Sequence, residues 1–246
     1  MSPTVVVLAG VLGAALLSMP VFALVHRGRK DRDAAEKGST FLLGLGDFLL
    51  HWFLWVLGPA ERLLVKLGAS PDHVNAAGLA FGLASGVLIG LGHLEAGGGA
   101  IALAGACDVL DGRVARAQRV ASPYGRFIDS TLDRFVETFA FLGFAAYFAR
   151  RPWGPLVVAA GLGGSLLVSY AQSRGESVGV SGSGGLMRRA ERLVLQSLGC
   201  LFDPVLCRWL GQPEGTVLFW ALVIMAAGAW ATAVHRTAWI ARRLRG

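Results

Sequence analysis

Four aspartates within a short, strongly apolar stretch constrain the possible folds of this chain more than any other feature. They form two pairs, Asp108 with Asp111 and Asp129 with Asp133. Spacings of three and four residues place each pair on one face of a helix. The segment 122–125, Ser-Pro-Tyr-Gly, lies between the pairs and predicts a helix break. Two carboxylate pairs facing each other across a helical hairpin would bind a divalent metal, and metal suggests phosphate.

The composition indicates an integral membrane protein. Of the 246 residues, 54% are hydrophobic and only 16% are charged, whereas a soluble domain carries about 25% charged residues. Several apolar runs reach the roughly 20 residues that a helix needs to cross a bilayer. The net charge of +7 favours contact with anionic membrane lipids, and we expect no nucleic acid partner.

The N-terminal 40 residues predict one transmembrane helix followed by a connector. Residues 4–25 are apolar and uncharged, and the hydrophilic residues 26–40 begin with a basic cluster. Positive charge gathers on the cytoplasmic side of a span, so the N-terminus is expected outside and the connector inside. Residues 41–68 combine Trp52 and Trp55 with frequent charges. This predicts an interfacial helix on the cytoplasmic face, with a further span as the alternative.

Residues 69–246 are expected to form a six-helix transmembrane core. Ser70-Pro71-Asp72 is typical of a helix start, and Gly97-Gly98-Gly99 is expected to be the first turn. The expected spans are residues 74–94, a third from about 100, 126–148, 154–173, 193–210 and 215–235. Alternation of the spans places most Lys and Arg on the cytoplasmic side, with the aspartates toward the same side. The fold class is therefore all-α, multi-pass, in the cell (inner) membrane.

Nothing structural requires four aspartates in apolar helices, each costing roughly 2.5–3.5 kcal/mol on insertion scales. The structural alternative is a set of ion pairs with Arg113, Arg116, Arg126 and Arg134, or a helix that lies less deep in the membrane. Hard oxygen ligands in this number suit Mg²⁺, Mn²⁺ or Ca²⁺. Gly112 and Ala115 leave room for a ligand to approach the backbone, and Arg116 can neutralise a phosphate beside the metal.

The same stretch resembles the signature of the CDP-alcohol phosphotransferase family. The matching positions are Asp108, Asp111, Gly112, Ala115, Arg116, Gly125, Asp129 and Asp133, all at the family's spacing. The resemblance implies transfer of a phosphatidyl group from CDP-diacylglycerol to a small polar alcohol, with release of CMP in phospholipid synthesis. It also implies Mg²⁺ or Mn²⁺ as cofactor and a homodimer as the assembly.

The resemblance also implies roles for single residues. Asp108, Asp111 and Asp129 would bind metal, and Asp133 would act as the general base while also touching a metal. The CDP site would be lined by Asp108, Gly112, Ala115, Arg116 and Gly125, with Gly125 allowing the turn.

Residues 169–192 are similar to the region that forms the acceptor-phosphate pocket in bacterial phosphatidylinositol-phosphate synthases. This implies acceptor binding by Arg174, Arg189 and Arg192. Gln172 stands where that subfamily typically has Lys, which opens free inositol beside inositol phosphate. A solvated or headgroup-facing start of the sixth span is the alternative role for these arginines.

Other functions remain open at this point. Glycerol phosphate and serine are alternative acceptors. A magnesium-dependent membrane prenyltransferase is an alternative enzyme, although its two Asp motifs are expected far apart in sequence. A non-catalytic transporter with a buried charge network is the alternative outside enzymes. Asp203 is expected to make a structural polar contact. Asp72 and Asn75 stand where relatives often carry Asn and Thr near the nucleotide, but a helix cap is their expected role.

Overall fold

The computed structural model describes residues 17–25, 46–181 and 184–245. These residues form helices and connecting turns, and no strand occurs among them. The chain divides into two compact units, Met1–Gly68 and Ala69–Gly246. An all-helical fold agrees with the prediction from composition.

The first unit joins a short helical segment to helix α3. Residues 17–25 are helical, and α3 spans Gly46–Lys66. The Phe22 ring lies 5.5 Å from that of Phe48 and 5.8 Å from that of Trp55. Trp52 Nε1 donates a hydrogen bond to Ser18 Oγ at 2.8 Å. The rest of the expected N-terminal span and the whole connector lie outside the described residues.

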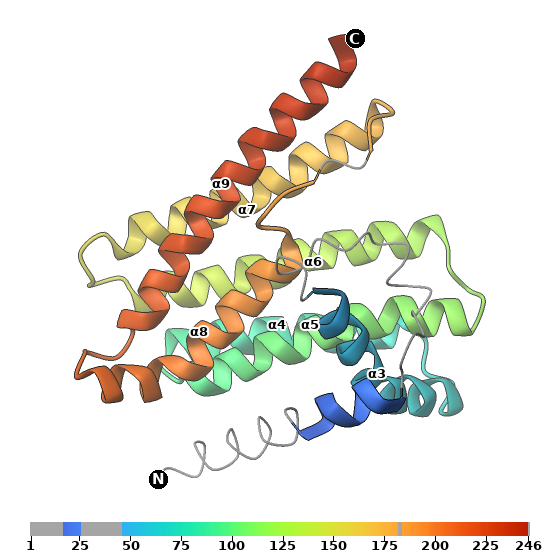
Figure 1. The fold of residues 1–246 in the computed structure, drawn as a ribbon, viewed down its shortest axis with the longest axis horizontal. Coiled ribbons are helices and arrows are strands. Elements are labelled where there is room, and N and C mark those ends of the chain that lie inside the picture. Colours follow the sequence, from blue (N-terminus) through green and yellow to red (C-terminus); the bar gives the residue numbers. More distant parts are fainter. Residues whose placement is uncertain (1–16, 26–45, 182–183, 246) are drawn as a thin grey trace. The chain divides into compact units, whose positions relative to one another are not determined.

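The second unit contains six long helices (Figure 1). They are α4 Pro71–Gly90, α5 Leu94–Ala117, α6 Pro123–Tyr147, α7 Gly154–Ser177, α8 Arg189–Leu210 and α9 Thr216–Arg245. Helix α4 packs against both α5 and α6, which touch each other only sparingly. Helix α8 packs against α5 and α9, and α7 lies beside α9. The α5–α6 hairpin is thus held open by α4 on one side.

Serine caps set the starts of α4 and α6. Ser70 Oγ accepts a hydrogen bond from the backbone N–H of His73, whose Nδ1 accepts from the N–H of Ser70, both at 3.3 Å. Ser122 Oγ accepts from the N–H of Gly125 at 3.1 Å. Both caps satisfy amide groups that have no partner inside a helix, and the one at Ser70 is reciprocal. The predicted start at Ser70-Pro71 and the break before α6 are confirmed, but the cap of α4 is Ser70 and not Asp72 as expected.

Two details of the predicted turns are wrong. Gly97–Gly99 lie inside α5, and the first turn instead falls at residues 91–93. Gly98 is needed for packing, because a Cβ there would meet Cys200 Cβ at 2.7 Å and the Ser197 carbonyl oxygen at 2.8 Å. Small residues allow such close approach of membrane helices. Gly125 is also helical, the third residue of α6, and is not part of the turn.

The core of the second unit is apolar and built from all six helices. Its centre contains Phe141, Phe144, Phe148, Leu222 and Met225, all nearly inaccessible to solvent. The tightest contact between α4 and α6 is glycine on backbone, since a Cβ on Gly86 would strike the Phe139 carbonyl oxygen.

Asp203 makes the structural contact that the sequence predicts. Its carboxylate accepts hydrogen bonds from the backbone N–H groups of Gly215 at 2.5 Å and Leu218 at 2.8 Å. A carboxylate at a helix N-terminus satisfies unpaired amides and interacts favourably with the helix dipole. Asp203 therefore joins α8 to the start of α9.

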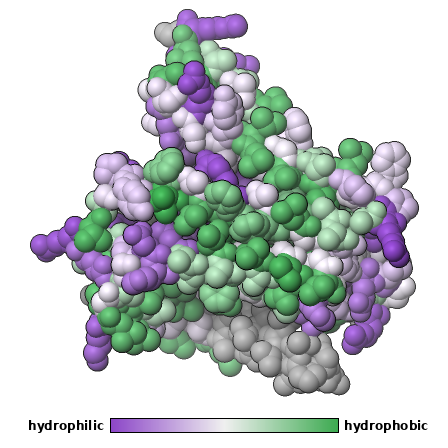
Figure 2. Space-filling view, turned by 180° about the vertical axis from the view of Figure 1, so that it is seen from behind, coloured by the Kyte–Doolittle hydropathy of each residue, from purple (hydrophilic) through white to green (hydrophobic). Residues whose placement is uncertain are grey.

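The protein is a multi-pass membrane protein. Among the described residues α3, α4, α7, α8 and α9 are long and apolar enough to cross a membrane, while α5 and α6 carry the aspartates. Because α3 qualifies by length and hydropathy, its interfacial location stays a prediction. Apolar side chains cover a broad part of the face in Figure 2, with hydrophilic ones toward its margins. Such an apolar surface suits lipid contact.

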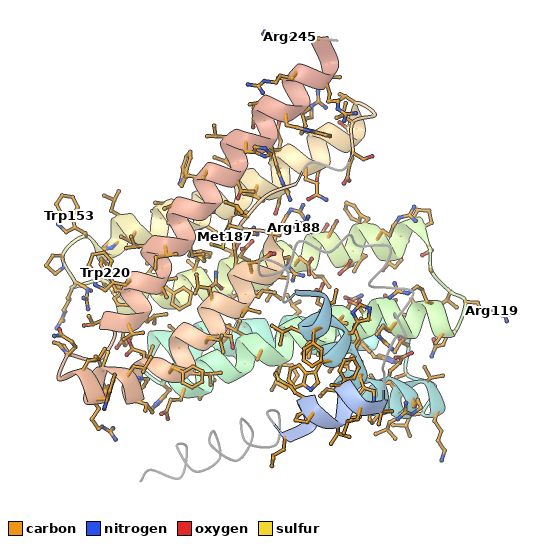
Figure 3. All side chains as sticks on the ribbon, viewed as in Figure 1. Arg119, Trp153, Met187, Arg188, Trp220 and Arg245 are labelled. Atoms are coloured by element: carbon orange, nitrogen blue, oxygen red, sulfur yellow. The ribbon has the colours of Figure 1, made fainter. Side chains whose placement is uncertain are left out.

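The two ends of the second unit differ in side chains. Trp153 and Trp220 lie at one end, and Arg119, after α5, lies at the opposite end (Figure 3). Tryptophans favour the headgroup level of a membrane, and arginines favour the cytoplasmic side. Arg151 is an exception beside Trp153, where its guanidinium lies 4.4 Å from the Phe219 ring centre. The aspartates are on the last turns of α5 and the first turns of α6, toward the Arg119 end.

Candidate active site

Three of the four aspartates converge. One carboxylate oxygen each from Asp108 on α5 and from Asp129 and Asp133 on α6 lie within 4.8 Å of one another. Asp111 is 5% exposed and lines the same cavity as Asp108 and Asp133, but it lies outside this group of three. The hairpin between α5 and α6 therefore brings the two predicted pairs to one place.

The cavity beside these carboxylates lies between α5 and α6. Helix α4 contributes Asn75, Gly78 and Leu79, and α8 contributes Arg189. The remaining lining residues are Ala104, Cys107, Asp108, Asp111, Leu132, Asp133 and Val136. The wall is apolar apart from Asn75, the carboxylates, Cys107 and Arg189, so charges in the cavity interact more strongly than they would in water.

The donor set fits a hard divalent cation. Asp108, Asp129 and Asp133 offer carboxylate oxygens, which Mg²⁺ and Mn²⁺ prefer over the soft ligands that zinc favours. Their oxygens lie close enough together to be bridged by one ion after small side-chain adjustments. These are the residues that would hold the metal, with Asp111 adjacent.

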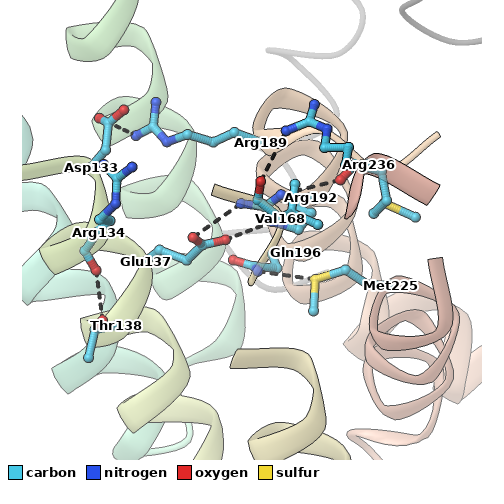
Figure 4. Close-up of polar contacts among 11 residues, drawn as sticks. Asp133, Arg134, Glu137, Thr138, Val168, Arg189, Arg192, Gln196, Met225 and Arg236 are labelled. Atoms are coloured by element: carbon cyan, nitrogen blue, oxygen red, sulfur yellow. Dashed lines mark hydrogen bonds and ion pairs between the residues drawn. The ribbon is translucent and has the colours of Figure 1, made fainter. Parts of the chain in front are cut away.

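The guanidinium of Arg189 forms ion pairs with two of the aspartates. Its Nη1 is 2.7 Å from Asp108 Oδ2, and its Nη2 is 2.5 Å from Asp133 Oδ1. Figure 4 shows the guanidinium reaching from the first turn of α8 to Asp133. One arginine therefore links the carboxylates of α5 and α6. The ion-pair alternative predicted such a contact, but with arginines close to the aspartates in sequence and not with Arg189 of α8.

Arg192 was expected in the acceptor pocket, but its side chain is buried inside the bundle and paired there with protein groups. It is 0% exposed. Its Nε and Nη2 donate to the two carboxylate oxygens of Glu137 at 2.8 and 3.2 Å, and its Nη1 donates to the Met187 carbonyl at 3.2 Å. A guanidinium with these partners is not presented to a ligand, and we assign Arg192 a structural role (Figure 4).

Gln172 is held between two charged side chains. Its Nε2 donates to Glu176 Oε1 at 3.1 Å, and its Oε1 accepts from Arg236 Nη1 at 2.7 Å. Arg236 is 4% exposed and also donates to the carbonyl oxygens of Val168 and Gly184. Arg174 is exposed near the end of α7. Of the predicted acceptor residues on α7, Gln172 thus contacts an arginine of α9.

The residues expected to line the CDP site follow Asp108 along α5. A Cβ on Gly112 would lie 3.3 Å from Arg116 Nη1, so the absent side chain leaves room for this guanidinium. Arg116 is exposed and Ala115 half-buried one residue earlier. That Gly112, Ala115, Arg116 and Gly125 bind CDP stays a prediction.

Sequence reasoning missed Glu137 and Arg236 and gave little weight to Asn75. Glu137 follows Asp133 by four residues in α6 and so lies on the same helix face. Arg236 stands inside a helix that continues to Arg245, whereas the expected span ended at residue 235. An ionisable residue within a membrane helix marks a functional or structural contact by default, and that signal could have found both.

Comparison with known proteins gives a consistent result. Residues 70–242 match the family model described as CDP-alcohol phosphatidyltransferase. The phosphatidylinositol phosphate synthase of Streptomyces avermitilis is 34% identical over 220 residues, which cover 85% of this chain and 89% of the relative. The archaetidylinositol phosphate synthase of Methanothermobacter thermautotrophicus is 29% identical over 181 residues, covering 73% and 87%.

Solved structures resemble the fold as well. Crystal structures of the Mycobacterium tuberculosis phosphatidylinositol phosphate synthase align over 74% of this chain. The one with CDP-DAG bound gives a TM-score of 0.64 at 27% identity over 92% of that chain. The complex with manganese and citrate gives 0.66 at 26% identity over 87%.

Proposed function

Because the chain belongs to the CDP-alcohol phosphatidyltransferase family, we propose that it transfers a phosphatidyl group from CDP-diacylglycerol to a hydroxyl of inositol phosphate. The family makes it a transferase of phospholipid synthesis and decides against the prenyltransferase and the transporter. The convergence of Asp108, Asp129 and Asp133 carries the proposal at the level of the site. The activities named for the relatives support the acceptor.

The donor binds at the aspartates. Asp108, Asp111 and Asp129 would hold Mg²⁺ or Mn²⁺ and, through it, the pyrophosphate of CDP-diacylglycerol, and Asp133 would contact the same metal. A divalent ion bound there would supply positive charge that offsets the negative charge of the pyrophosphate and of the departing CMP. Arg116 adds a further positive charge on the same helix, and Gly112 and Ala115 let the nucleotide approach the backbone of α5. The manganese and the CDP-DAG in the structures of the mycobacterial relative support these assignments.

Asp133 is the general base. It takes the proton from the acceptor hydroxyl while that oxygen forms a bond to the phosphorus of the phosphatidyl group. The bond from this phosphorus to the CMP oxygen breaks, and CMP leaves with the electron pair. A positioned carboxylate of this kind contributes about 10²–10⁴-fold to a rate.

Positively charged side chains on α7 and α8 bind the acceptor phosphate. We assign this role to Arg174 and Arg189, with Gln172 held in place by Arg236. The active site faces the cytoplasm of the inner membrane, where water-soluble acceptors are available. Residues 69–246 form the catalytic domain. The assembly is a homodimer, as the family resemblance implies.

An acceptor panel tests this proposal. Purified protein is supplied with CDP-diacylglycerol, Mn²⁺ and either inositol phosphate, inositol, glycerol phosphate or serine, and the CMP and lipid products are measured. We expect inositol phosphate to exceed inositol in kcat/KM by at least about tenfold, since a hydrogen bond to a charged group contributes about 1.5–3 kcal/mol. Higher kcat/KM with glycerol phosphate or serine would contradict the acceptor assignment. If none of the four acceptors elicits CMP release from protein that binds Mn²⁺ normally, the proposed reaction itself is contradicted.

A further inference from the structure

Arg189 competes for the carboxylates that the proposed function assigns to the metal. We propose that Arg189 is a displaceable counter-cation. In the metal-free protein it neutralises Asp108 and Asp133, and a divalent ion entering the site displaces its guanidinium, which then faces the acceptor. This inference rests on the proposed function, because it takes the same carboxylates as the metal ligands.

The geometry places the guanidinium between the two helices of the hairpin. Its two terminal nitrogens contact different carboxylates, Asp108 Oδ2 at 2.7 Å and Asp133 Oδ1 at 2.5 Å. Both aspartates belong to the group of three with Asp129, whose oxygens lie within 4.8 Å of one another. Arg189 therefore neutralises two of the carboxylates that would bind the metal, as an ion bound there would do.

Metal and guanidinium do not fit on these oxygens together. Arginine always carries its charge and offers only donors. A Mg²⁺ ion needs oxygen ligands at about 2.0–2.1 Å in near-octahedral geometry. An ion bound to the inner oxygens of both carboxylates would lie next to the guanidinium, and two cations at that separation repel strongly in a poorly solvated cavity.

Arg189 is less enclosed than Arg192, which lies one turn further along α8. Arg192 is 0% exposed and is held by Glu137 and the Met187 carbonyl. The side chain of Arg189 is 24% exposed, and it stands at the first residue of the helix. Its Nε makes no hydrogen bond within the described residues. Among the described residues its guanidinium forms ion pairs with Asp108 and Asp133. An ion bound to these carboxylates would neutralise their charge and so weaken both ion pairs.

Displacement couples the two halves of the reaction. Before the metal arrives, the charge of Arg189 is neutralised by the aspartates and is of little use to an anionic acceptor. Once released, the same guanidinium can form charge-assisted hydrogen bonds to a phosphate. By linkage, metal then strengthens acceptor binding, and acceptor strengthens metal binding by the same factor.

The test is Mn²⁺ affinity in the absence of any substrate. Free Mn²⁺ is measured by its paramagnetic resonance signal during titration of purified protein in detergent, at fixed ionic strength. Arg189→Gln is expected to bind Mn²⁺ about tenfold more tightly, because removing a competitor raises the fraction of sites open to the ion. Arg189→Lys is expected to bind about threefold more tightly, since a point charge cannot span both carboxylates as a guanidinium does.

Two controls separate this inference from the metal site itself. Arg134→Gln removes the same charge from the residue next to Asp133, where the guanidinium donates to Ser173 Oγ at 3.4 Å, and it is expected to change affinity by less than about twofold. Asp129→Asn is expected to lose most of the Mn²⁺ binding. Equal binding by Asp129→Asn and wild type would overturn the metal site and this inference with it.

Whether the Arg189 variants bind Mn²⁺ more tightly or more weakly than wild type tests the displacement separately from the metal site. A ligating carboxylate is commonly supported by an outer partner, and losing such a partner weakens metal binding by about 10–100-fold. Unchanged or weaker Mn²⁺ binding by both Arg189 variants, with Asp129→Asn still defective, would therefore overturn the displacement while leaving the proposed function intact. Size-exclusion profiles of the variants check that each is folded, and Arg189→Lys retains a charge for Asp108 and Asp133 if the glutamine variant does not fold.

Discussion

Replacing Asp133 with asparagine is expected to lower CMP release by about 10³-fold, within the range that a positioned general base contributes. The amide keeps the size of the side chain but cannot accept the proton of the acceptor hydroxyl. Asp133 stands in the third turn of α6, with Asp108 and Asp129 close by. The measurement is the initial rate of CMP release from CDP-diacylglycerol at saturating Mn²⁺ and inositol phosphate.

A matched control variant and a metal titration separate the loss of a general base from a non-specific effect and from the loss of a metal ligand. Glu214→Gln makes the same chemical change at an exposed position in the turn before α9 and is expected to retain wild-type rates. If Asp133 were only a metal ligand, excess Mn²⁺ would restore much of the rate to Asp133→Asn. Full recovery in excess metal, or a loss of less than about tenfold, would contradict the role of base.

Breaking the pair of Glu137 and Arg192 is expected to produce the largest loss of stability in the chain. Both side chains are almost fully buried, at 4% and 0% exposure. They share two hydrogen bonds, at 2.8 and 3.2 Å. Removing one partner leaves the other charge buried and uncompensated, at a cost of about 3–5 kcal/mol. Glu137→Leu and Arg192→Met are therefore each expected to lower the midpoint of unfolding in detergent.

The double variant distinguishes a structural pair from a pair that serves the acceptor. Replacing a buried ion pair by apolar residues of similar volume is often neutral, so Glu137→Leu/Arg192→Met is expected to recover most of the lost stability. The coupling between the two changes is read from the double-mutant cycle. Single variants that unfold like wild type, but raise the KM for inositol phosphate, would contradict the structural role and return Arg192 to the acceptor pocket.

Local sequence patterns predicted the parts of the site that depend on nearby residues. The spacings within Asp108–Asp133 placed each pair on one helix face, and Ser122 with Pro123 marked where α6 begins. Because a tight hairpin joins the two helices, convergence of the pairs followed from the sequence alone. The start of α4 at Ser70-Pro71 was predicted for the same reason, since a cap involves residues only three positions apart. The capping residue itself was predicted wrongly, because Ser70 and not Asp72 accepts the hydrogen bond from the His73 N–H.

Contacts between distant segments could not be read in the same way. Arg189 reaches Asp108 because α8 packs against α5, and no local pattern encodes that crossing. Gly97–Gly99 have the composition of a turn, yet close packing against α8 requires Gly98 within a helix. Two arginines near the start of α8 therefore look equivalent in sequence, whereas the fold buries Arg192 on Glu137 and leaves Arg189 on the aspartates.

The most direct test of the reaction measures both products at once. Protein reconstituted into lipid vesicles receives CDP-diacylglycerol and inositol phosphate, with Mn²⁺ or with a chelator. CMP and phosphorylated inositol lipid are then quantified in the same samples. We expect equal amounts of the two products with metal, and neither product with chelator or without acceptor. CMP without a matching lipid product, or unchanged turnover in chelator, would contradict a metal-dependent phosphatidyl transfer.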